Sequence, residues 1–280
     1  MNKELKSEVS VIILTWNSEK YIKNCIESVF NDASLSNVSI EIIVVDNGSM
    51  DGTVKILEQL QEKYPNLKVI KLEKNLGTTV PRNIAIKKSL GEYIFILDSD
   101  TEVQAGTLKT LIETIESGSK VGVAAPRLLY PDKTIQPSCK KFPTAKIKFY
   151  KFLPFDKFHR VAKQEELYDP AVYSKSFNKI VDVDYCISAA WLVNRKAIED
   201  VELLDENIFY SPEDVDYCLR MWLKGWRVVY NPKARIIHYS QRISHKSFRM
   251  TLSHAKGLLY YFKKYKYLSN RERIYKKIKR

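Results

Sequence analysis

The sequence predicts an α/β fold in which helices flank a mostly parallel sheet. Short runs of β-branched and aliphatic residues recur along the first half of the chain, and segments with helical periodicity separate them. This alternation places consecutive strands in parallel and the intervening helices on both faces. With 280 residues, 45% of them hydrophobic, the chain can enclose a full core.

The elements are expected in the following order. Strands are predicted at residues 9–14, 40–45, 69–72, 93–97 and 121–125, where apolar runs are too short for helices. Helices are predicted from Ser18, a capping residue, to about Phe30, and at 53–63, 81–90 and 104–117. An apolar stretch at 181–193, a helix at 212–224 and two short strands near 227–230 and 235–238 follow, and the chain beyond Ser240 is expected to be helical and basic.

Two carboxylates, Asp98 and Asp100, follow the apolar run Tyr93–Leu97 directly. Residues i and i+2 of an extended chain point to the same side, so both carboxylates can converge on one hard cation. A cation held with open positions suits a diphosphate better than a closed protein cage does. The alternative is that these residues only cap a turn, where aspartate is common.

Polar residues also follow the first two predicted strands. Thr15, Trp16 and Asn17 end the first, and Asp46 follows the apolar run of the second. Such residues gather at the carboxyl edge of an open sheet, where ligands bind. Asp46 can accept a hydrogen bond from a base or a ribose, and Trp16 offers a ring for stacking. Because the sequence contains neither GxGxxG nor GxxxxGK[ST], a metal and side chains must meet any phosphate charge.

Two further residues each have a functional and a structural interpretation. Asp214 lies in Ser211-Pro212-Glu213-Asp214, a helix-start pattern with Ser211 as the N-cap, so it is either a capping residue or a general base. His238 follows an apolar strand and is either an ordinary strand-end histidine or a third metal ligand beside Asp100. Asp216 is interpreted as a structural hydrogen-bonding residue.

Six segments together resemble the family 2 inverting glycosyltransferases of the GT-A fold, and most closely their rhamnosyltransferase-like branch. The resemblance covers roughly residues 8–245 and is carried by VSVIILTWN, EIIVVDNGSMDGT, NLGTTVPRNIA, IFILDSD, PEDVDYCLRMWLKGWRVVYNPKARIIH and a trailing Ser.

The resemblance implies a role for each of these residues. Thr15 and Asn17 would contact the nucleotide and Asp46 would read the nucleobase. Asp98 would contact the ribose and sugar, while Asp100 and His238 would bind Mg²⁺ or Mn²⁺. Asp214 would deprotonate the acceptor hydroxyl in one in-line displacement. The implied activity is transfer of a hexosyl group from dTDP-rhamnose or a UDP-sugar to a growing, lipid-linked bacterial surface polysaccharide.

Two segments depart from the family pattern. Pro81 and Arg82 interrupt a stretch that is usually small and glycine-rich, and Arg82 is proposed to supply positive charge to the diphosphate. Ser188-Ala189-Ala190 stands where a Gly-Ala pair is common in the family, so the resemblance does not predict the shape of the sugar pocket. Trp191 is interpreted as a core residue rather than as part of the acceptor site.

Positive charge concentrates at two places. The segment from Arg242 to the end holds thirteen of the 46 Lys and Arg residues but only one acid, Glu272. We expect residues 1–240 to form the transferase domain and 241–280 a basic amphipathic extension that binds an anionic membrane surface. The alternative is that this extension packs on the domain. Within the domain, residues 139–180 are predicted to be a mobile insertion rich in basic and aromatic residues, which include Phe142, Phe149, Tyr150, Phe152, Phe155 and Phe158. The alternative is an ordinary surface segment whose aromatic side chains are tucked in.

The remaining expectations concern location and rival functions. Four cysteines without CxxC spacing predict free thiols, and with no apparent signal peptide or spanning segment this indicates a cytoplasmic protein at the inner face of the membrane. A sugar-nucleotidyltransferase shares the sheet and metal acids, but TWNSEK stands where its glycine-rich signature belongs. A nucleic-acid-binding protein would explain the basic tail. The basic residues of the tail lie outside the polar carboxyl edge of the predicted sheet, so no nucleic-acid partner is expected.

Overall fold

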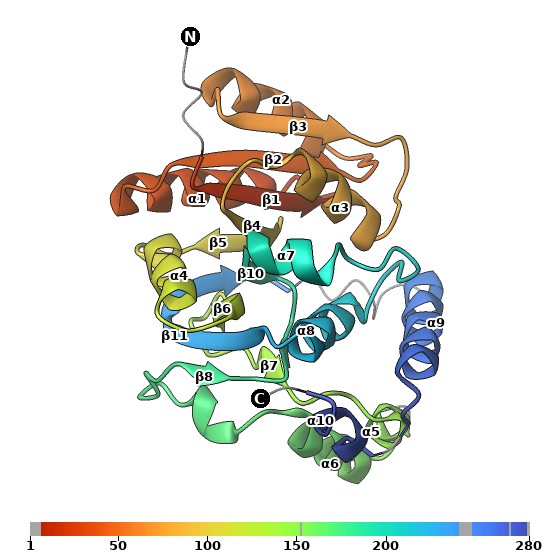
Figure 1. Ribbon diagram of the computed structural model, residues 1–280. Helices are drawn as coiled ribbons and strands as arrows, with labels where there is room; N and C mark the ends of the chain where they lie inside the picture. The colour runs from red at the N-terminus through yellow and green to blue at the C-terminus, as the bar shows by residue number, and fades with distance from the viewer. Residues whose placement is uncertain (1–6, 152, 241–247, 269, 279–280) are drawn as a thin grey trace.

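A sheet of nine strands crosses the protein (Figure 1). The computed structural model describes residues 7–151, 153–240, 248–268 and 270–278. Eight strands follow one another in space in the order β3 (Leu67–Lys71), β2 (Ile40–Asp46), β1 (Val9–Thr15), β4 (Tyr93–Asp98), β10 (Ala190–Asn194), β6 (Val121–Leu129), β11 (Arg227–His238) and β5 (Thr101–Val103). The ninth, β8 (Val181–Asp182), pairs with β11.

Parallel pairing dominates the part of the sheet built by the first half of the chain. The strands β3, β2, β1 and β4 are parallel neighbours, and β6 pairs in parallel with β11. β10 is antiparallel to both β4 and β6 and joins the two parallel groups. The predicted α/β fold with a mostly parallel sheet is therefore confirmed.

Each face of the sheet has its own hydrophobic core, because successive strand residues point to opposite faces. Val11 and Ile13 pack in the core beneath α1 (Ile22–Ser36), α2 (Thr53–Lys63) and α4 (Thr107–Glu116). Ile12 belongs to the opposite core, which includes residues of α3 (Thr79–Lys88), α7 (Arg195–Val201), α8 (Glu213–Leu223) and α9 (Phe248–Tyr265). Trp191 is fully buried in this second core, as predicted.

Some element boundaries differ from the prediction. Residues 18–21 form a turn, with the Ser18 carbonyl accepting from Tyr21 and Ile22, so α1 begins at Ile22 and extends to Ser36. The two strands expected near 227–230 and 235–238 are one strand, β11, whose register with β6 shifts between Asn231 and Arg235. Pro232 lies in this interval, and its missing N–H accounts for the irregular pairing.

The segment 139–180 contains β7 (Cys139–Lys140), α5 (Ala145–Tyr150), α6 (Asp156–Glu166) and a short 3₁₀ helix (Pro170–Tyr173). β7 pairs with β9 (Tyr185–Cys186), and the C-terminal α10 (Glu272–Tyr275) lies with α5 and α6 (Figure 1). Arg271 donates to the carbonyls of Phe142 and Glu165. Phe142 is buried, Phe149 and Phe155 are exposed, and Phe152 lies outside the described residues. The mobility of this insertion stays a prediction.

The C-terminal extension packs on the domain through one face of α9. Leu258, Tyr261 and Phe262 are buried, and Lys264 forms ion pairs with Asp205 and Asp216. The apolar face of α9 is therefore buried against the domain, as expected in the alternative in which the extension packs on the domain. Among the helices that the structure describes, none has both the length and the apolar character needed to cross a bilayer.

Candidate active site

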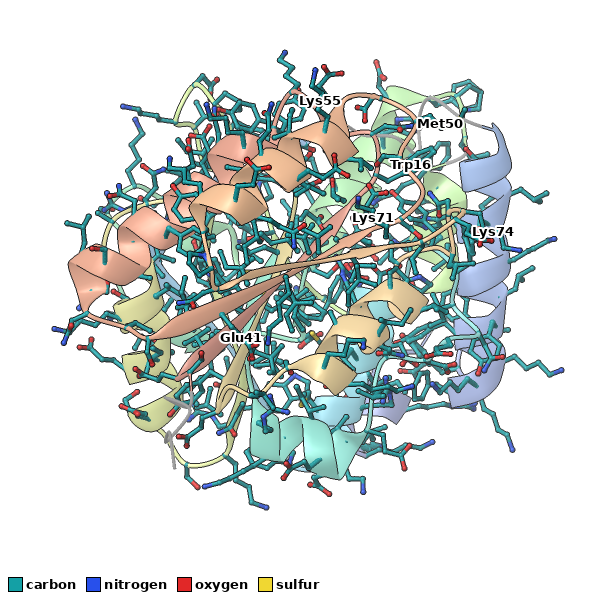
Figure 2. All side chains as sticks on the ribbon, turned by 90° about the horizontal axis from the view of Figure 1, so that it is seen from above. Trp16, Glu41, Met50, Lys55, Lys71 and Lys74 are labelled. Atoms are coloured by element: carbon teal, nitrogen blue, oxygen red, sulfur yellow. The ribbon has the colours of Figure 1, made fainter. Side chains whose placement is uncertain are left out.

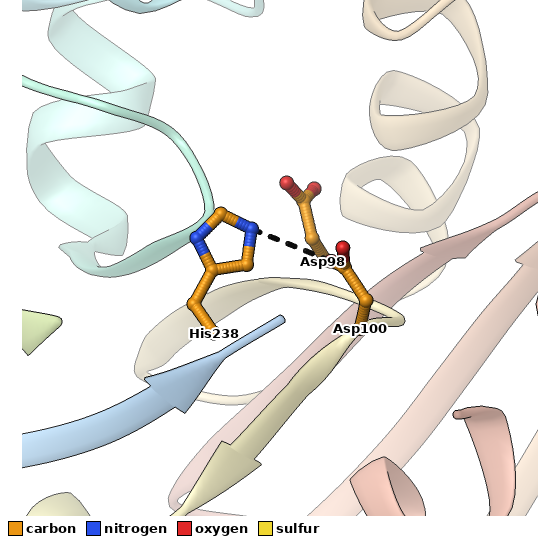
Figure 3. A group of neighbouring side chains, drawn as sticks. All are labelled: Asp98, Asp100 and His238. Atoms are coloured by element: carbon orange, nitrogen blue, oxygen red, sulfur yellow. Dashed lines mark ion pairs between the residues drawn. The ribbon is translucent and has the colours of Figure 1, made fainter. Parts of the chain in front are cut away.

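Three potential metal ligands meet at one rim of the sheet: Asp98, Asp100 and His238 (Figure 3). Asp98 ends β4, Asp100 lies in the turn to β5, and His238 ends β11. β5 pairs with β11 so that His238 stands opposite Thr101, and this register brings the histidine beside Asp100. One ligand atom from each residue lies within 4.8 Å of the others. The predicted neighbours are thus together in the fold.

The ring of His238 is oriented by a residue that the sequence analysis missed. Its Nδ1 lies 2.9 Å from Oε1 of Gln136, and its Nε2 lies 3.5 Å from Oδ1 of Asp100. Burial disfavours the charged imidazole, but the hydrogen bond and charge of Asp100 raise the pKa of His238 above its usual value. Donation from Nδ1 to Gln136 directs Nε2 toward the carboxylates, which is the arrangement of a metal-binding histidine with an orienting partner.

The carboxylate of Asp98 is joined to α8 through Arg82. Nη2 of Arg82 donates to Oδ1 of Asp98 at 2.7 Å, while Nη1 lies 3.2 Å from Oε1 of Glu213 and 3.1 Å from Oγ of Ser188. Arg82 is only 1% exposed. Burial raises the pKa of Asp98, with Arg82 opposing and Asp100 adding to the rise. Direct contact between Arg82 and a diphosphate stays a prediction, because the structure directs both of its terminal nitrogens at protein groups.

Asp214 lies half-buried in the first turn of α8. The predicted N-cap, Ser211, is wrong: the helix cap is Pro212, whose carbonyl accepts from Asp216, and it makes no side-chain cap bond. Burial and the neighbouring Glu213 raise the pKa of Asp214 to about 7, although Lys140 opposes the rise. A carboxylate with a pKa near neutrality is suited to accept a proton from a hydroxyl group. The structural role expected for Asp216 is confirmed by its bonds to Arg220, Lys264 and Tyr265.

At the ends of β1 and β2, two buried oxygen atoms lack a protein partner among the described residues: Oγ1 of Thr15 and Oδ1 of Asp46. The two residues are paired in register across these strands, so both oxygens belong to the same level of the sheet. Oδ2 of Asp46 accepts from the backbone of Ser49. A buried acceptor without a partner is costly, so a ligand that donates here would be strongly favoured.

Asn17 connects two loops beside these atoms. Its backbone N–H donates to Oγ of Ser49, and its Oδ1 accepts from the backbone of Met50. Trp16 and Met50 project at the end of the sheet where β1 and β2 finish, away from Glu41 (Figure 2). Asp98 pairs in register with Leu14 of β1. The predicted nucleotide-binding residues and Asp98 therefore lie at the same edge of the sheet.

Comparisons with known proteins agree with this arrangement. The sequence model of the family described as Glycosyl transferase family 2 matches residues 10–201. N-acetylglucosaminyl-diphospho-decaprenol L-rhamnosyltransferase of Mycobacterium tuberculosis is 27% identical over 234 residues, which cover 77% of this chain and 70% of that protein. Poly(ribitol-phosphate) β-N-acetylglucosaminyltransferase TarS of Staphylococcus aureus is 42% identical over 101 residues, or 36% of this chain and 17% of that protein.

Solved structures show the same fold. GalNAc-T7, crystallised with UDP, GalNAc and Mn²⁺, matches with a TM-score of 0.60 and 17% identity over 84% of this chain and 44% of that one. Residues 1–349 of Staphylococcus aureus TarS match with a TM-score of 0.55 and 23% identity over 88% of this chain and 65% of that one. The predicted GT-A architecture is confirmed, and the chain spans less than half of the GalNAc-T7 chain and about a third of the TarS chain.

Proposed function

The chain belongs to glycosyl transferase family 2, and we propose that it is an inverting, metal-dependent enzyme that transfers a hexosyl group from a nucleoside-diphosphate sugar to a hydroxyl of a growing, lipid-linked bacterial surface polysaccharide. One observation carries this proposal. A continuous set of contacts runs from the Asp98, Asp100 and His238 group through Arg82 to Glu213, the residue next to Asp214. Donor-side and acceptor-side chemistry would therefore share one rim of the sheet.

The residues divide into donor and acceptor roles. We assign Asp46, Thr15 and Asn17 to the nucleoside, because Thr15 and Asp46 offer buried oxygens beside the Asn17 loop that have no partner in the described part of the chain. Asp98 is assigned to the ribose and sugar. Asp214 is assigned as the base that takes the proton of the attacking hydroxyl, in a single displacement without a covalent intermediate.

The group of Asp98, Asp100 and His238 fits a site for Mg²⁺ or Mn²⁺. A carboxylate from Asp100 and an imidazole from His238 would leave positions for phosphate oxygens, and both ions prefer oxygen ligands. When bound, the ion would neutralise the charge that develops on the leaving diphosphate. We assign Asp100 and His238 as its ligands, and Gln136 as the residue that holds the imidazole in place. Arg82 would act on the donor through the Asp98 carboxylate that it holds.

A nucleotide-sugar panel tests the proposal. Purified protein is incubated with dTDP-rhamnose and several UDP-sugars, with Mn²⁺ or Mg²⁺, and nucleoside diphosphate release is measured. The acceptors are N-acetylglucosaminyl diphosphate on a prenyl chain, a ribitol phosphate oligomer and a neutral alkyl N-acetylglucosaminide. Acceptor-dependent release that EDTA abolishes is the expected result. Release that is indifferent to EDTA would remove the metal from the proposal, and no release with any pair would contradict this choice of donor and acceptor.

We also propose that the enzyme is cytoplasmic and binds the inner face of the membrane through its C-terminal extension. Leu259 and Leu268 are 71% and 63% exposed, and they line an open groove together with Lys263, Lys266 and Arg273. Exposed apolar groups beside cations are the features of an interfacial membrane contact.

Vesicle binding tests this attachment. Removal of residues 257–280 would also strip buried Tyr261 and Phe262 from the core, so a double substitution, Leu259→Ser with Leu268→Ser, is the cleaner variant. It should weaken sedimentation with vesicles containing anionic lipid. Leu35→Ser on α1, where the side chain is 67% exposed, is the matched control. Equal sedimentation of all three proteins would contradict the membrane contact.

A further inference from the structure

Three lysines surround one buried glutamate in the 139–180 segment. Nζ of Lys148 lies 2.8 Å from Oε1 of Glu166, Nζ of Lys140 lies 3.8 Å from Oε2, and Lys151 also pairs with Oε2. Glu166 is 4% exposed, whereas the lysine side chains keep between 17% and 40% of their surface accessible. One buried carboxylate thus faces three ammonium groups, each on a lysine side chain that is partly accessible.

This arrangement has more positive charge than Glu166 requires. Glu166 carries one negative charge against the three positive charges of the lysines, so the ammonium groups also repel one another. Burial and the charge of Lys148 lower the pKa of Lys151 to about 8. His254 of α9 lies in the same surroundings, where burial and Lys148 lower its pKa to about 4 and keep its ring neutral at pH 7. A second anion would relieve the repulsion among the lysines.

The lysines lie on the side of the site where Asp214 stands. Lys140 of β7 pairs with Tyr185 of β9, and three residues further along the chain Ser188 contacts Glu213. Lys140 and Lys148 are close enough to Asp214 to lower its pKa against the effect of burial. The largest charge effects on Asp98, in contrast, come from Arg82, Asp100, His238 and Glu213. Lys140 and Lys148 therefore lie near the proposed base, and the charges that act most strongly on Asp98 belong to other residues.

We propose that Lys140, Lys148 and Lys151 form a binding site for a phosphate group carried by the acceptor substrate. This inference rests on the proposed function, which places the acceptor beside Asp214. Glu166 would hold the three ammonium groups in position, and their remaining protons would donate charge-assisted hydrogen bonds to phosphate oxygens. The phosphate could belong to a lipid diphosphate or to a polyol phosphate polymer, and the chemistry recognised is the same in both.

The test compares the two phosphate-bearing acceptors with the neutral acceptor, the alkyl N-acetylglucosaminide. The variants are Lys148→Gln and Lys151→Gln, each of which leaves Glu166 two lysine partners. The measured quantity is kcat/KM with a phosphate-bearing acceptor divided by kcat/KM with the neutral alkyl glycoside. We expect this ratio to fall at least tenfold in each variant. Lys157→Gln, on the exposed surface of α6, is the matched control and should leave the ratio unchanged.

The two phosphate-bearing acceptors distinguish the sources. A fall in the ratio with the prenyl diphosphate acceptor alone supports the site and assigns it to a lipid carrier, and a fall with the ribitol phosphate oligomer alone assigns it to a polymer. An unchanged ratio with both acceptors overturns the proposal. So does an equal loss with charged and neutral acceptors, because that result would show a purely structural role for the lysines.

A binding measurement keeps the inference testable even if no acceptor in the panel is turned over. Inorganic pyrophosphate is titrated into the metal-free protein in a calorimeter. We expect Lys148→Gln to weaken its binding at least tenfold, and Lys157→Gln and Asp100→Asn to leave it unchanged. Failure of turnover with normal pyrophosphate sensitivity would contradict the proposed function alone. Equal pyrophosphate binding by the parent protein and Lys148→Gln would overturn the lysine site.

Discussion

Arg82 holds Asp98 through a hydrogen bond of 2.7 Å between Nη2 and Oδ1, and the same guanidinium reaches Glu213 with Nη1. One side chain of α3 thereby joins the end of β4 to the first turn of α8. The two carboxylates belong to opposite halves of the proposed reaction, so the spacing between donor and base depends on this arginine.

Replacement of Arg82 by alanine should abolish activity and destabilise the protein. Glu213 would lose the cation beside its buried charge, as would the less buried Asp98, and breaking a buried ion pair typically costs about 3–5 kcal/mol. Arg82→Lys keeps the charge but not the two-point geometry, so it should retain more stability than activity. Thermal unfolding and nucleoside diphosphate release check both effects, with Lys87→Ala, on the exposed end of α3, as the control. Full activity in Arg82→Ala would contradict the positioning role.

Asp214→Asn should reduce turnover by about 10²–10⁴-fold while donor affinity stays nearly intact, because the amide cannot accept the proton. The same change should stabilise the protein at pH 8. The folded-state pKa of Asp214 is raised to about 7, so its contribution to stability is greatest below the unfolded-state pKa of about 4 and declines as pH rises toward 7. We expect a gain of about 1 kcal/mol, seen as a rise in Tm of a few degrees. Unchanged turnover would show that another group is the base.

The pH profile should report the same carboxylate. The base acts only when ionised, so kcat/KM at saturating metal should be high above about pH 7 and fall about tenfold per unit below it. Glu213→Gln removes the neighbouring charge that helps to raise this pKa, and its profile should shift to lower pH. A profile that is flat between pH 5 and 8 would argue against Asp214.

Gln136→Leu should weaken Mn²⁺ binding by about 10–100-fold, because His238 would lose the partner that orients its ring. The metal ligands themselves would remain in place, so Asp100→Asn should have a larger effect. Calorimetric titration with Mn²⁺ measures both, and Gln164→Leu on the exposed surface of α6 is the control. Identical Mn²⁺ affinity in Gln136→Leu would remove the orienting role of this glutamine.

Gly257→Ala should destabilise the protein, although alanine normally stabilises a helix interior by about 1 kcal/mol relative to glycine. A Cβ atom at position 257 would lie 2.2 Å from the carbonyl oxygen of Ser211, too close for real atoms. The loop before Glu213 and Asp214 must shift, so kcat should fall as well. Thermal unfolding and turnover are compared with Lys256→Ala, one residue earlier on an exposed position. A stabilised, fully active Gly257→Ala would show that the contact is not close.

Much of this architecture is predictable from sequence because local patterns determine it. The apolar runs that end in Thr15, Asp46 and Asp98 are strands, and parallel pairing brings their carboxyl ends to one edge. The residues alone left open whether His238 lies beside Asp100, since their contact depends on the pairing of β5 with β11 across more than a hundred residues.

The contacts that the sequence did not reveal are long-range and involve residues without a strong local signature. Gln136, Ser188 and Glu166 come from loops or a short helix and acquire their roles only when distant segments meet. The departure noted at Ser188 was the one available signal, because a hydroxyl in place of glycine implies a new hydrogen bond. Ser211 does not act as a cap because its backbone has a φ of 45°, in the left-handed region, whereas the residue that caps a helix normally has an extended backbone.

The contact between Gly257 and Ser211 also limits how this protein can be recombined with others. An exchange of the C-terminal segment for that of another transferase would bring a Cβ atom against the Ser211 carbonyl unless the incoming helix carries a glycine at this position. A chimera without it would be forced to rebuild the loop that carries the proposed base. The C-terminal helix and the loop before the proposed base therefore have to be kept together, because glycine at position 257 has no Cβ atom and lets the two segments approach closely.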